Sequence, residues 1–151
     1  MLFVVFQLSR DRYALDAREI VEVLPLVSLR RVPSAPAGLA GLLDYRGEPI
    51  PIVDLALMAL GRPSAHRLST RIILVEAEGY VRFGLIAEFV TQTLRLESGA
   101  FSQFPVRVDG AAYLGPVANT PSGMVQWITP GKLLTPKLKT ALAEINLKEA
   151  V

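Results

Sequence analysis

The chain has 151 residues, enough for one domain or for two small subdomains around a shared core. Hydrophobic residues make up 51% of the sequence and charged residues 20%, which excludes disorder for the chain as a whole, and the longest apolar runs fall far short of the about 20 residues of a membrane-spanning helix. The net charge is only +2 with scattered basic residues, unlike a typical nucleic-acid binder, and the absence of cysteine excludes disulfides and thiolate metal sites.

The N-terminal segment is predicted to consist of short strands. Residues 3–8 form an apolar run, residues 9–12 a polar turn and residues 13–15 a second strand, so together they predict a hairpin. Residues 16–19 fit one helical turn, and residues 20–24 are β-branched and strand-like. The N-terminus has neither the basic region nor the cleavage site of a signal peptide, so we expect a soluble protein.

The strongest local signals lie in residues 38–55. This stretch predicts a strand, a turn over residues 46–49 and a second strand that contains Pro51. Because proline removes a donor from the strand ladder, the second strand is expected at an edge or at a bulge. Arg46, in the middle of the stiff turn, is expected to be exposed and is the most suggestive single residue of the sequence.

A short helix and a linker are predicted to follow this hairpin. Asp54 is placed to accept hydrogen bonds from the first amides of the helix, and Gly61 is placed to end it. Residues 61–70 are polar and contain a proline, as in a linker.

The second half of the chain repeats part of the first. Residues 12–24 align with residues 82–94 at a constant offset of seventy, without a gap. The identical pairs are Arg12/Arg82, Leu15/Leu85, Ala17/Ala87 and Leu24/Leu94. Together with the similar order of turns and strands, this agreement predicts an internal duplication and two related β subdomains.

The rest of the second half is predicted to contain strands, a connecting loop and a C-terminal helix. In chain order these are strands at residues 71–77 and 80–96, a loop at 97–110, strands at 113–118 and 123–128 around a turn at 119–122, and an amphipathic helix at 136–151. Many short strands separated by glycine and proline favour small barrels.

The sequence offers no catalytic or metal-binding set. His66 is the only histidine, lies in the predicted linker and has no cysteine or second histidine to join it. Asp44 and Glu48 flank Arg46, but the solvation of a turn or an ion pair with Arg46 explains them more simply than acid–base chemistry does. We therefore predict a non-enzymatic protein without a cofactor or metal.

Four segments resemble the CheW family, the adaptors of bacterial chemosensory arrays. Residues 41–55, GLLDYRGEPIPIVDL, are similar to the family's motif of Gly, then Asn-Leu-Arg-Gly, then Pro-x-x-Asp-Leu. Residues 3–24 look like the opening strands, residues 82–94 resemble the second-half motif, and residues 123–134, GMVQWITPGKLL, look like the last strands. The resemblance covers almost the whole chain.

The resemblance implies a mainly β fold. The family has two five-stranded, SH3-like β-barrels that share a hydrophobic core, with short helices and a C-terminal helix. We expect a single domain over residues 1–151. Its halves are roughly residues 14–70 and residues 1–13 plus 71–135, with strand exchange between the halves left open.

The resemblance also implies a function. Family members couple the cytoplasmic tip of a methyl-accepting chemoreceptor to the regulatory domain of a CheA-type histidine kinase, in the cytoplasm at membrane-associated receptor arrays. Carried over by position, Arg46, with Gly47 beside it, matches the motif arginine linked to receptor contact. Ile20, Glu22 and Gly41 match positions associated with docking on receptor or kinase.

The sequence departs from the family pattern at several positions. Asp44-Tyr45 replaces the usual Asn-Leu, Glu88 replaces an aspartate, and Thr129 stands where an acidic residue is common. These departures leave open which receptor, kinase and output are involved, including a surface-sensing or twitching-motility system. Two alternatives also remain: a small-barrel nucleic-acid-binding protein, and a CheW-like capping domain that binds only one partner.

Overall fold

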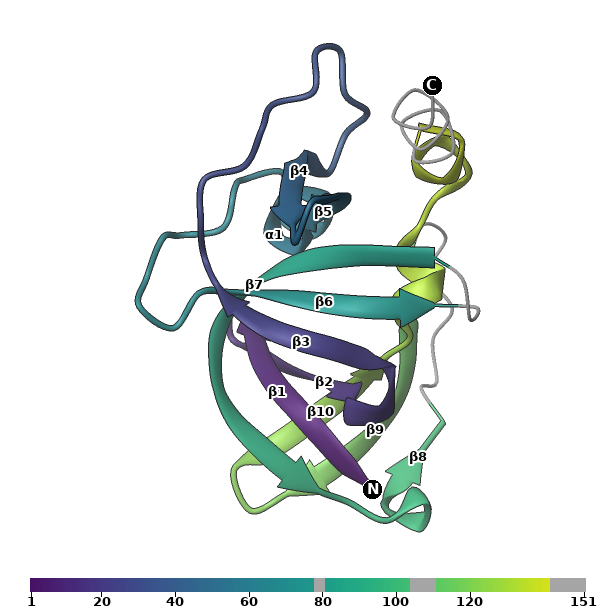
Figure 1. Cartoon of the computed structure of the whole chain (residues 1–151). Helices are drawn as coiled ribbons and strands as arrows, with labels where there is room; N and C mark the ends of the chain where they lie inside the picture. The colour runs from purple at the N-terminus through teal and green to yellow at the C-terminus, as the bar shows by residue number, and fades with distance from the viewer. Residues whose placement is uncertain (78–80, 104–110, 142–151) are drawn as a thin grey trace.

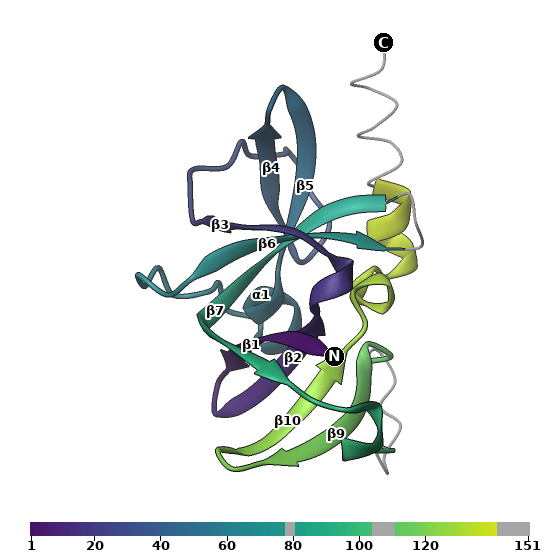
Figure 2. The same cartoon turned by 60° about the horizontal axis from the view of Figure 1, so that its bottom comes forward.

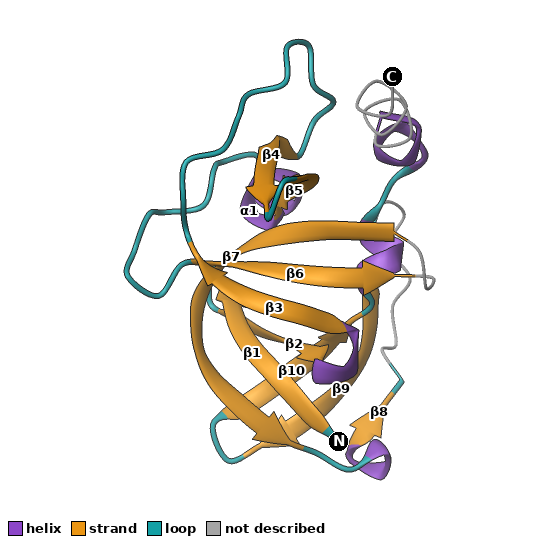
Figure 3. Cartoon of the chain, in the orientation of Figure 1, coloured by secondary structure: helices purple, strands orange, loops and turns teal. Residues whose placement is uncertain are grey.

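The computed structural model describes residues 1–77, 81–103 and 111–141, and its fold is mainly β with short helices, as predicted (Figures 1 and 3). The strands are β1 Leu2–Leu8, β2 Asp11–Asp16, β3 Ile20–Pro25, β4 Leu39–Tyr45, β5 Glu48–Asp54, β6 Arg71–Ala77, β7 Val81–Arg95, β8 Phe101–Ser102, β9 Leu114–Thr120 and β10 Gly123–Ile128. The helices are η1 Ala17–Glu19, α1 Leu55–Leu60, η2 Ser98–Ala100, η3 Pro130–Leu133 and the helical residues 136–141. The rest of the predicted C-terminal helix, residues 142–151, lies outside the described residues.

The long strand β7 joins two sheets. Sheet A contains β7, β1, β2, β10, β9 and β8, and sheet B contains β3, β6, β7, β5 and β4. Residues 81–87 of β7 pair with β6 in sheet B, and the later residues of β7 pair with β1 in sheet A. Figure 1 shows β7 running from one sheet into the other, and Figure 2 shows the β4–β5 and β9–β10 hairpins at opposite ends of the molecule.

The strand pairings follow the same plan in both halves of the chain. β1 pairs antiparallel with β2, as β6 does with β7. β3 pairs with β6, while the end of β7 pairs with β1, so the halves exchange strands. β5 runs parallel to β7, and β10 runs parallel to β2. The subdomain boundaries drawn from the sequence stay a prediction.

The core lies in three clusters, one within each sheet and one between them. The apolar run at residues 72–75 of β6 is buried on both faces: Ile73 and Val75 face the central cluster, whereas Ile72 and Leu74 face the cluster of sheet B. The central cluster draws residues from both halves, including Phe6, Leu15, Phe83 and Ile128. This burial on both faces ties the two sheets into one hydrophobic unit.

The hairpin and its helix form where the sequence predicts them, but the turn predicted at residues 46–49 is shorter, because Glu48 and Pro49 already pair with β4. β5 is paired with β4 along its length but with β7 only at residues 52–54, so Pro51 has a neighbouring strand on one side only. The Asp54 carboxylate accepts hydrogen bonds from the amides of Ala56 at 3.1 Å and Leu57 at 3.4 Å, which starts α1. Gly61 ends α1 in the left-handed conformation, with a φ of 73°.

Other predicted segments also differ in the structure. The polar turn predicted at residues 9–12 is shorter, because Asp11 and Arg12 already pair with β1. Within the loop predicted at residues 97–110, the chain forms η2 and the short strand β8, and residues 104–110 lie outside the described residues. The turn predicted at residues 119–122 is shorter, because Thr120 and Gly123 are already paired across the hairpin. The strand β8 and the shorter turn at residues 119–122 both depend on pairing with β9, which local sequence does not reveal.

Candidate partner-binding surface

The tip of the β4–β5 hairpin is a two-residue turn with unusual backbone angles. Arg46 and Gly47 lie between the paired residues Tyr45 and Glu48 and have φ values of 54° and 84°. Positive φ at both central residues is the type I′ geometry, which favours Asn-Gly. An arginine there costs about 1 kcal/mol, so its presence points to a use outside folding.

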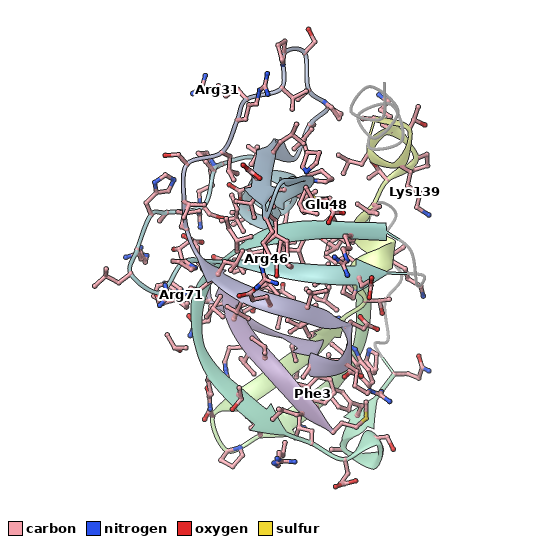
Figure 4. The ribbon with its side chains drawn as sticks, in the orientation of Figure 1. Phe3, Arg31, Arg46, Glu48, Arg71 and Lys139 are labelled. Atoms are coloured by element: carbon pink, nitrogen blue, oxygen red, sulfur yellow. The ribbon has the colours of Figure 1, made fainter. Side chains whose placement is uncertain are left out.

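The Arg46 side chain extends from this tip over the edge of sheet B (Figure 4). It is 78% exposed, and its guanidinium carbon lies 5.0 Å from the centre of the Tyr45 ring. Its Nη2 is 3.9 Å from Oε2 of Glu22 on β3. The arginine is therefore held between an aromatic face and a carboxylate, with most of its surface open to a partner.

Tyr45 connects the hairpin to β3 through Glu22. The Tyr45 hydroxyl donates a hydrogen bond to Glu22 Oε2, the same oxygen that faces Arg46. This bond is the main cause that raises the pKa of Tyr45 above that of an ordinary tyrosine, and desolvation adds to it. The contact crosses 23 residues of sequence, and no local motif predicts it.

Charged residues on the other side of the tip are also engaged. Arg82 on β7 lies 3.8 Å from Glu48 and donates a hydrogen bond from Nε to Glu76 at 3.2 Å. Asp44 Oδ1 accepts a hydrogen bond from the amide of Gly47 at 2.9 Å and so supports the turn. These contacts give Asp44 and Glu48 structural roles, and the ion pair of Arg46 is with Glu22 instead.

The aliphatic part of this surface comes from Val21, which is 40% exposed. The predicted site residue Ile20 is half-buried and packs against the central cluster. A register shift between Ile20 and Glu22 inserts Val21 as a bulge, and Val21 lines a shallow depression with Tyr45. The sequence indicated that one residue of the Ile20-Val21 pair faces outward but not which one.

Gly41 has no exposed surface for a partner. It is buried, with a φ of 154°, and a Cβ atom there would lie 2.6 Å from the carbonyl oxygen of Arg30. The next residue, Leu42, exchanges backbone hydrogen bonds of 2.8 and 2.9 Å with Arg30. Beyond this contact, a groove of about 220 Å³ runs along the hairpin, lined by Arg30, Leu42, Leu43, Asp44, Gly47 and Pro49.

Buried carboxylates fix the loop that follows α1. Asp54 accepts hydrogen bonds from the Ser64 amide at 2.9 Å and the Ser64 hydroxyl at 2.6 Å. Glu88 accepts a hydrogen bond from the Ala65 amide at 2.8 Å and pairs with Arg62 at 3.3 Å. Glu88, one of the departures from the family pattern, therefore holds the loop at residues 62–65 and takes no part in the surface around Arg46.

His66 is exposed, and no three histidine, cysteine or carboxylate residues of the described ranges are grouped to hold a metal ion. None of the helices in the part of the chain that the structure describes is long and apolar enough to cross a bilayer.

Comparison with known proteins accounts for this arrangement. The CheW-like domain matches residues 2–137. The chain belongs to the CheW-like domain family. The crystal structure of the scaffolding protein TtCheW from Thermoanaerobacter tengcongensis is similar to this CheW-like fold, with a TM-score of 0.80 and 28% identity over 91% of this chain and 89% of that one.

Two curated relatives are similar over shorter stretches. The chemotaxis protein CheW of Treponema pallidum is 36% identical over 52 residues, which cover 34% of this chain and 31% of that protein. The chemotaxis protein CheW of Helicobacter pylori is 22% identical over 103 residues, which cover 68% of this chain and 62% of that protein. This CheW-like chain thus spans less than two thirds of the length of either relative.

Proposed function

We propose that this CheW-like chain is a non-catalytic adaptor that couples methyl-accepting chemoreceptors to a CheA-type histidine kinase in a bacterial chemosensory pathway. The observation that carries the proposal is Arg46, which is held outward at a positive φ of 54° and is 78% exposed, next to Tyr45 and the exposed Val21. A strained backbone position that is kept for a charged, exposed side chain is expected at a binding site.

The chemistry of the surface fits a helical partner. Receptor tips are helical hairpins, and such helices bind where aliphatic side chains meet a charged rim. Val21 supplies the aliphatic part, and Arg46 and Arg82 supply cations at the rim. Arg46 is placed to bind a receptor carboxylate, which contributes more to specificity than to affinity.

An adaptor also needs a surface for its second partner. We assign the regulatory domain of the kinase to a second surface, separate from the Arg46 tip. The complex forms in the cytoplasm, at membrane-associated receptor arrays. The departures at Asp44 and Tyr45, which lie at the Arg46 tip, bear on which receptor is bound.

The direct test replaces Arg46 with glutamate and measures binding to the cytoplasmic fragment of the cognate receptor by calorimetry. We expect at least about a tenfold loss of affinity, because the new carboxylate repels the carboxylate of the partner. Arg10→Glu is the matched control, since Arg10 is an exposed arginine in the β1–β2 turn. Unchanged binding by a folded Arg46→Glu protein contradicts the assignment of this surface.

A ternary pull-down separates an adaptor from a capping domain. The receptor fragment, this chain and the regulatory domain of the kinase are mixed, and the complex is isolated through a tag on the receptor. An adaptor brings down the kinase domain only when this chain is present. A capping domain holds one partner at a time, so increasing amounts of the kinase domain release the receptor.

A further inference from the structure

The Glu22 carboxylate lies between two possible donors, and only one of them bonds to it. The Tyr45 hydroxyl donates a hydrogen bond to Oε2 of Glu22. Arg46 Nη2 is 3.9 Å from the same oxygen, which is too long for a hydrogen bond. The close partner of Glu22 is therefore the neutral hydroxyl, and the arginine interacts with it only as a more distant charge.

Because Glu22 bonds to the Tyr45 hydroxyl, the N–H donors of Arg46 remain unused. A guanidinium has five N–H groups in a fork that matches a carboxylate, and Arg46 donates no hydrogen bond to any residue of the described ranges. The Tyr45 ring supports one face of the guanidinium at 5.0 Å and takes up none of these N–H groups. Of the other carboxylates near the tip, Glu48 and Glu76 are paired with Arg82, and Asp44 accepts a hydrogen bond from the Gly47 amide.

We propose that Tyr45 is a positioning residue that determines specificity: its hydroxyl occupies Glu22, so Arg46 remains available to form a bidentate bond with a partner carboxylate. The inference deepens the proposed function, on which it rests. A partner carboxylate then has to displace only a long ion pair, and Glu22 keeps its hydrogen bond when Arg46 moves away. Binding of the partner therefore does not leave the Glu22 carboxylate without a hydrogen-bond donor, which would cost free energy.

Removing the hydroxyl reverses this arrangement. In Tyr45→Phe the ring still supports Arg46, but Glu22 has lost its donor and its side chain turns to Arg46. The partner carboxylate must then compete with a hydrogen-bonded internal ion pair. We expect a loss of affinity of about fivefold, and we expect Glu22→Gln to abolish this dependence because a neutral amide does not compete for the cation.

The experiment is a double-mutant cycle with the full chain and the receptor cytoplasmic fragment. Affinities are measured by calorimetry for the wild type, Tyr45→Phe, Glu22→Gln and the double variant, and thermal unfolding verifies each fold. The proposal predicts that Tyr45→Phe weakens binding when Glu22 is present and has no effect when Gln replaces it. An equal loss in both backgrounds, or no loss in either, overturns it. Tyr113→Phe, which alters another half-buried tyrosine, is the matched control.

A second measurement needs no partner and therefore separates this inference from the proposed function. The pKa of Tyr45 is followed by NMR of ring-labelled tyrosine, with Tyr45→Phe used for assignment. We expect a raised pKa in the wild type that falls toward the ordinary tyrosine value in Glu22→Gln. A pKa that does not change in Glu22→Gln contradicts the hydrogen bond. If the pKa of Tyr45 falls in Glu22→Gln but Arg46→Glu still binds the receptor, the Tyr45–Glu22 hydrogen bond is present and the assignment of this surface to the receptor is wrong.

Discussion

The β4–β5 and β9–β10 hairpins have the same place in their sheets and different tips. Each has a two-residue turn, and each second strand runs parallel to a strand of its sheet. The arginines of the sequence repeat also correspond, since Arg82 faces Glu48 and Arg12 donates a hydrogen bond to Thr120 at 3.3 Å. The two hairpins therefore share their strand pairings, and they differ mainly in their turns.

The second turn is stabilised internally and carries no charge. Thr120 Oγ1 accepts a hydrogen bond from the Ser122 amide at 3.3 Å and donates one to the Gly123 carbonyl at 2.7 Å. Pro121 has its φ fixed near −65°, so this turn differs from the type I′ turn at Arg46. The β9–β10 turn therefore has the properties expected of a hairpin that serves folding alone. The β4–β5 hairpin instead has a strained backbone at Arg46 and presents the cation of that residue.

The largest expected effects lie at the bases of both hairpins. A Cβ atom at Gly41 would lie 2.6 Å from the Arg30 carbonyl oxygen, and one at Gly115 would lie 2.8 Å from that of Trp127. Gly41→Ala and Gly115→Ala should each lower the free energy of unfolding by about 3 kcal/mol, measured by urea denaturation. Gly47→Ala meets no atoms and should cost only about 1 kcal/mol, from its positive φ. If Gly41→Ala or Gly115→Ala left the free energy of unfolding unchanged, the two hairpin bases would not share this close backbone approach.

The next effect concerns the helices that follow the hairpins. Asp54 caps α1 and also holds Ser64, whereas Thr129 makes no side-chain cap to η3. Asp54→Ala should cost about 2 kcal/mol of unfolding free energy, and Thr129→Ala less than about 0.5 kcal/mol. Urea denaturation of both variants compares the N-terminus of α1 with that of η3. Equal losses of unfolding free energy would show that Asp54 contributes little as a cap.

A smaller effect of opposite sign is expected at the strained tip. Asparagine adopts positive φ more readily than arginine, so Arg46→Asn should raise the free energy of unfolding by about 0.5 kcal/mol. The same variant should bind the receptor fragment at least about tenfold more weakly. Ser122→Asn in the other hairpin is the control and should leave binding unchanged. Lower stability in Arg46→Asn would mean that Arg46 serves the fold.

The smallest effect distinguishes the repeated segments themselves. Asp16 is buried and accepts hydrogen bonds from the Arg18 side chain and amide, which lower its pKa, whereas Ile86 stands seventy residues later. Because the folded pKa is lower than the unfolded one, this stabilisation is complete above the unfolded value of about 3.9 and is lost as the pH falls through the folded pKa. The stability of Asp16→Asn should therefore depend less on pH below about 4. An unchanged pH dependence would contradict this role.

Features set by neighbouring residues were predictable from the sequence. The strand at residues 71–77, the caps Asp54 and Gly61, and the exposed turn at Arg46 all follow from residues within a few positions. Such features depend on backbone preferences and on local hydrogen bonds, so their sequence signals are short and direct.

Features set by distant pairing were not predictable from the sequence. The bulge that exposes Val21 depends on the register of β3 against β6, and the Tyr45–Glu22 bond depends on where the hairpin lies over β3. Ile20 illustrates the limit, because strand periodicity shows that neighbours alternate but does not identify the buried face. The repeat suggested related halves, but the exchange of strands between the sheets required the structure.

The strand β7 carries a bend that both sheets depend on. At Phe89, φ is 53°, the Arg67 guanidinium lies 5.0 Å from the ring centre, and the next amide, of Val90, donates to the Ser69 carbonyl at 2.9 Å. Because one continuous strand serves both sheets, neither sheet can unfold without taking away a strand of the other, and we expect a single cooperative unfolding transition. A ligand that binds only at the β4–β5 tip should then slow global hydrogen exchange in β1 and β2, which it does not touch.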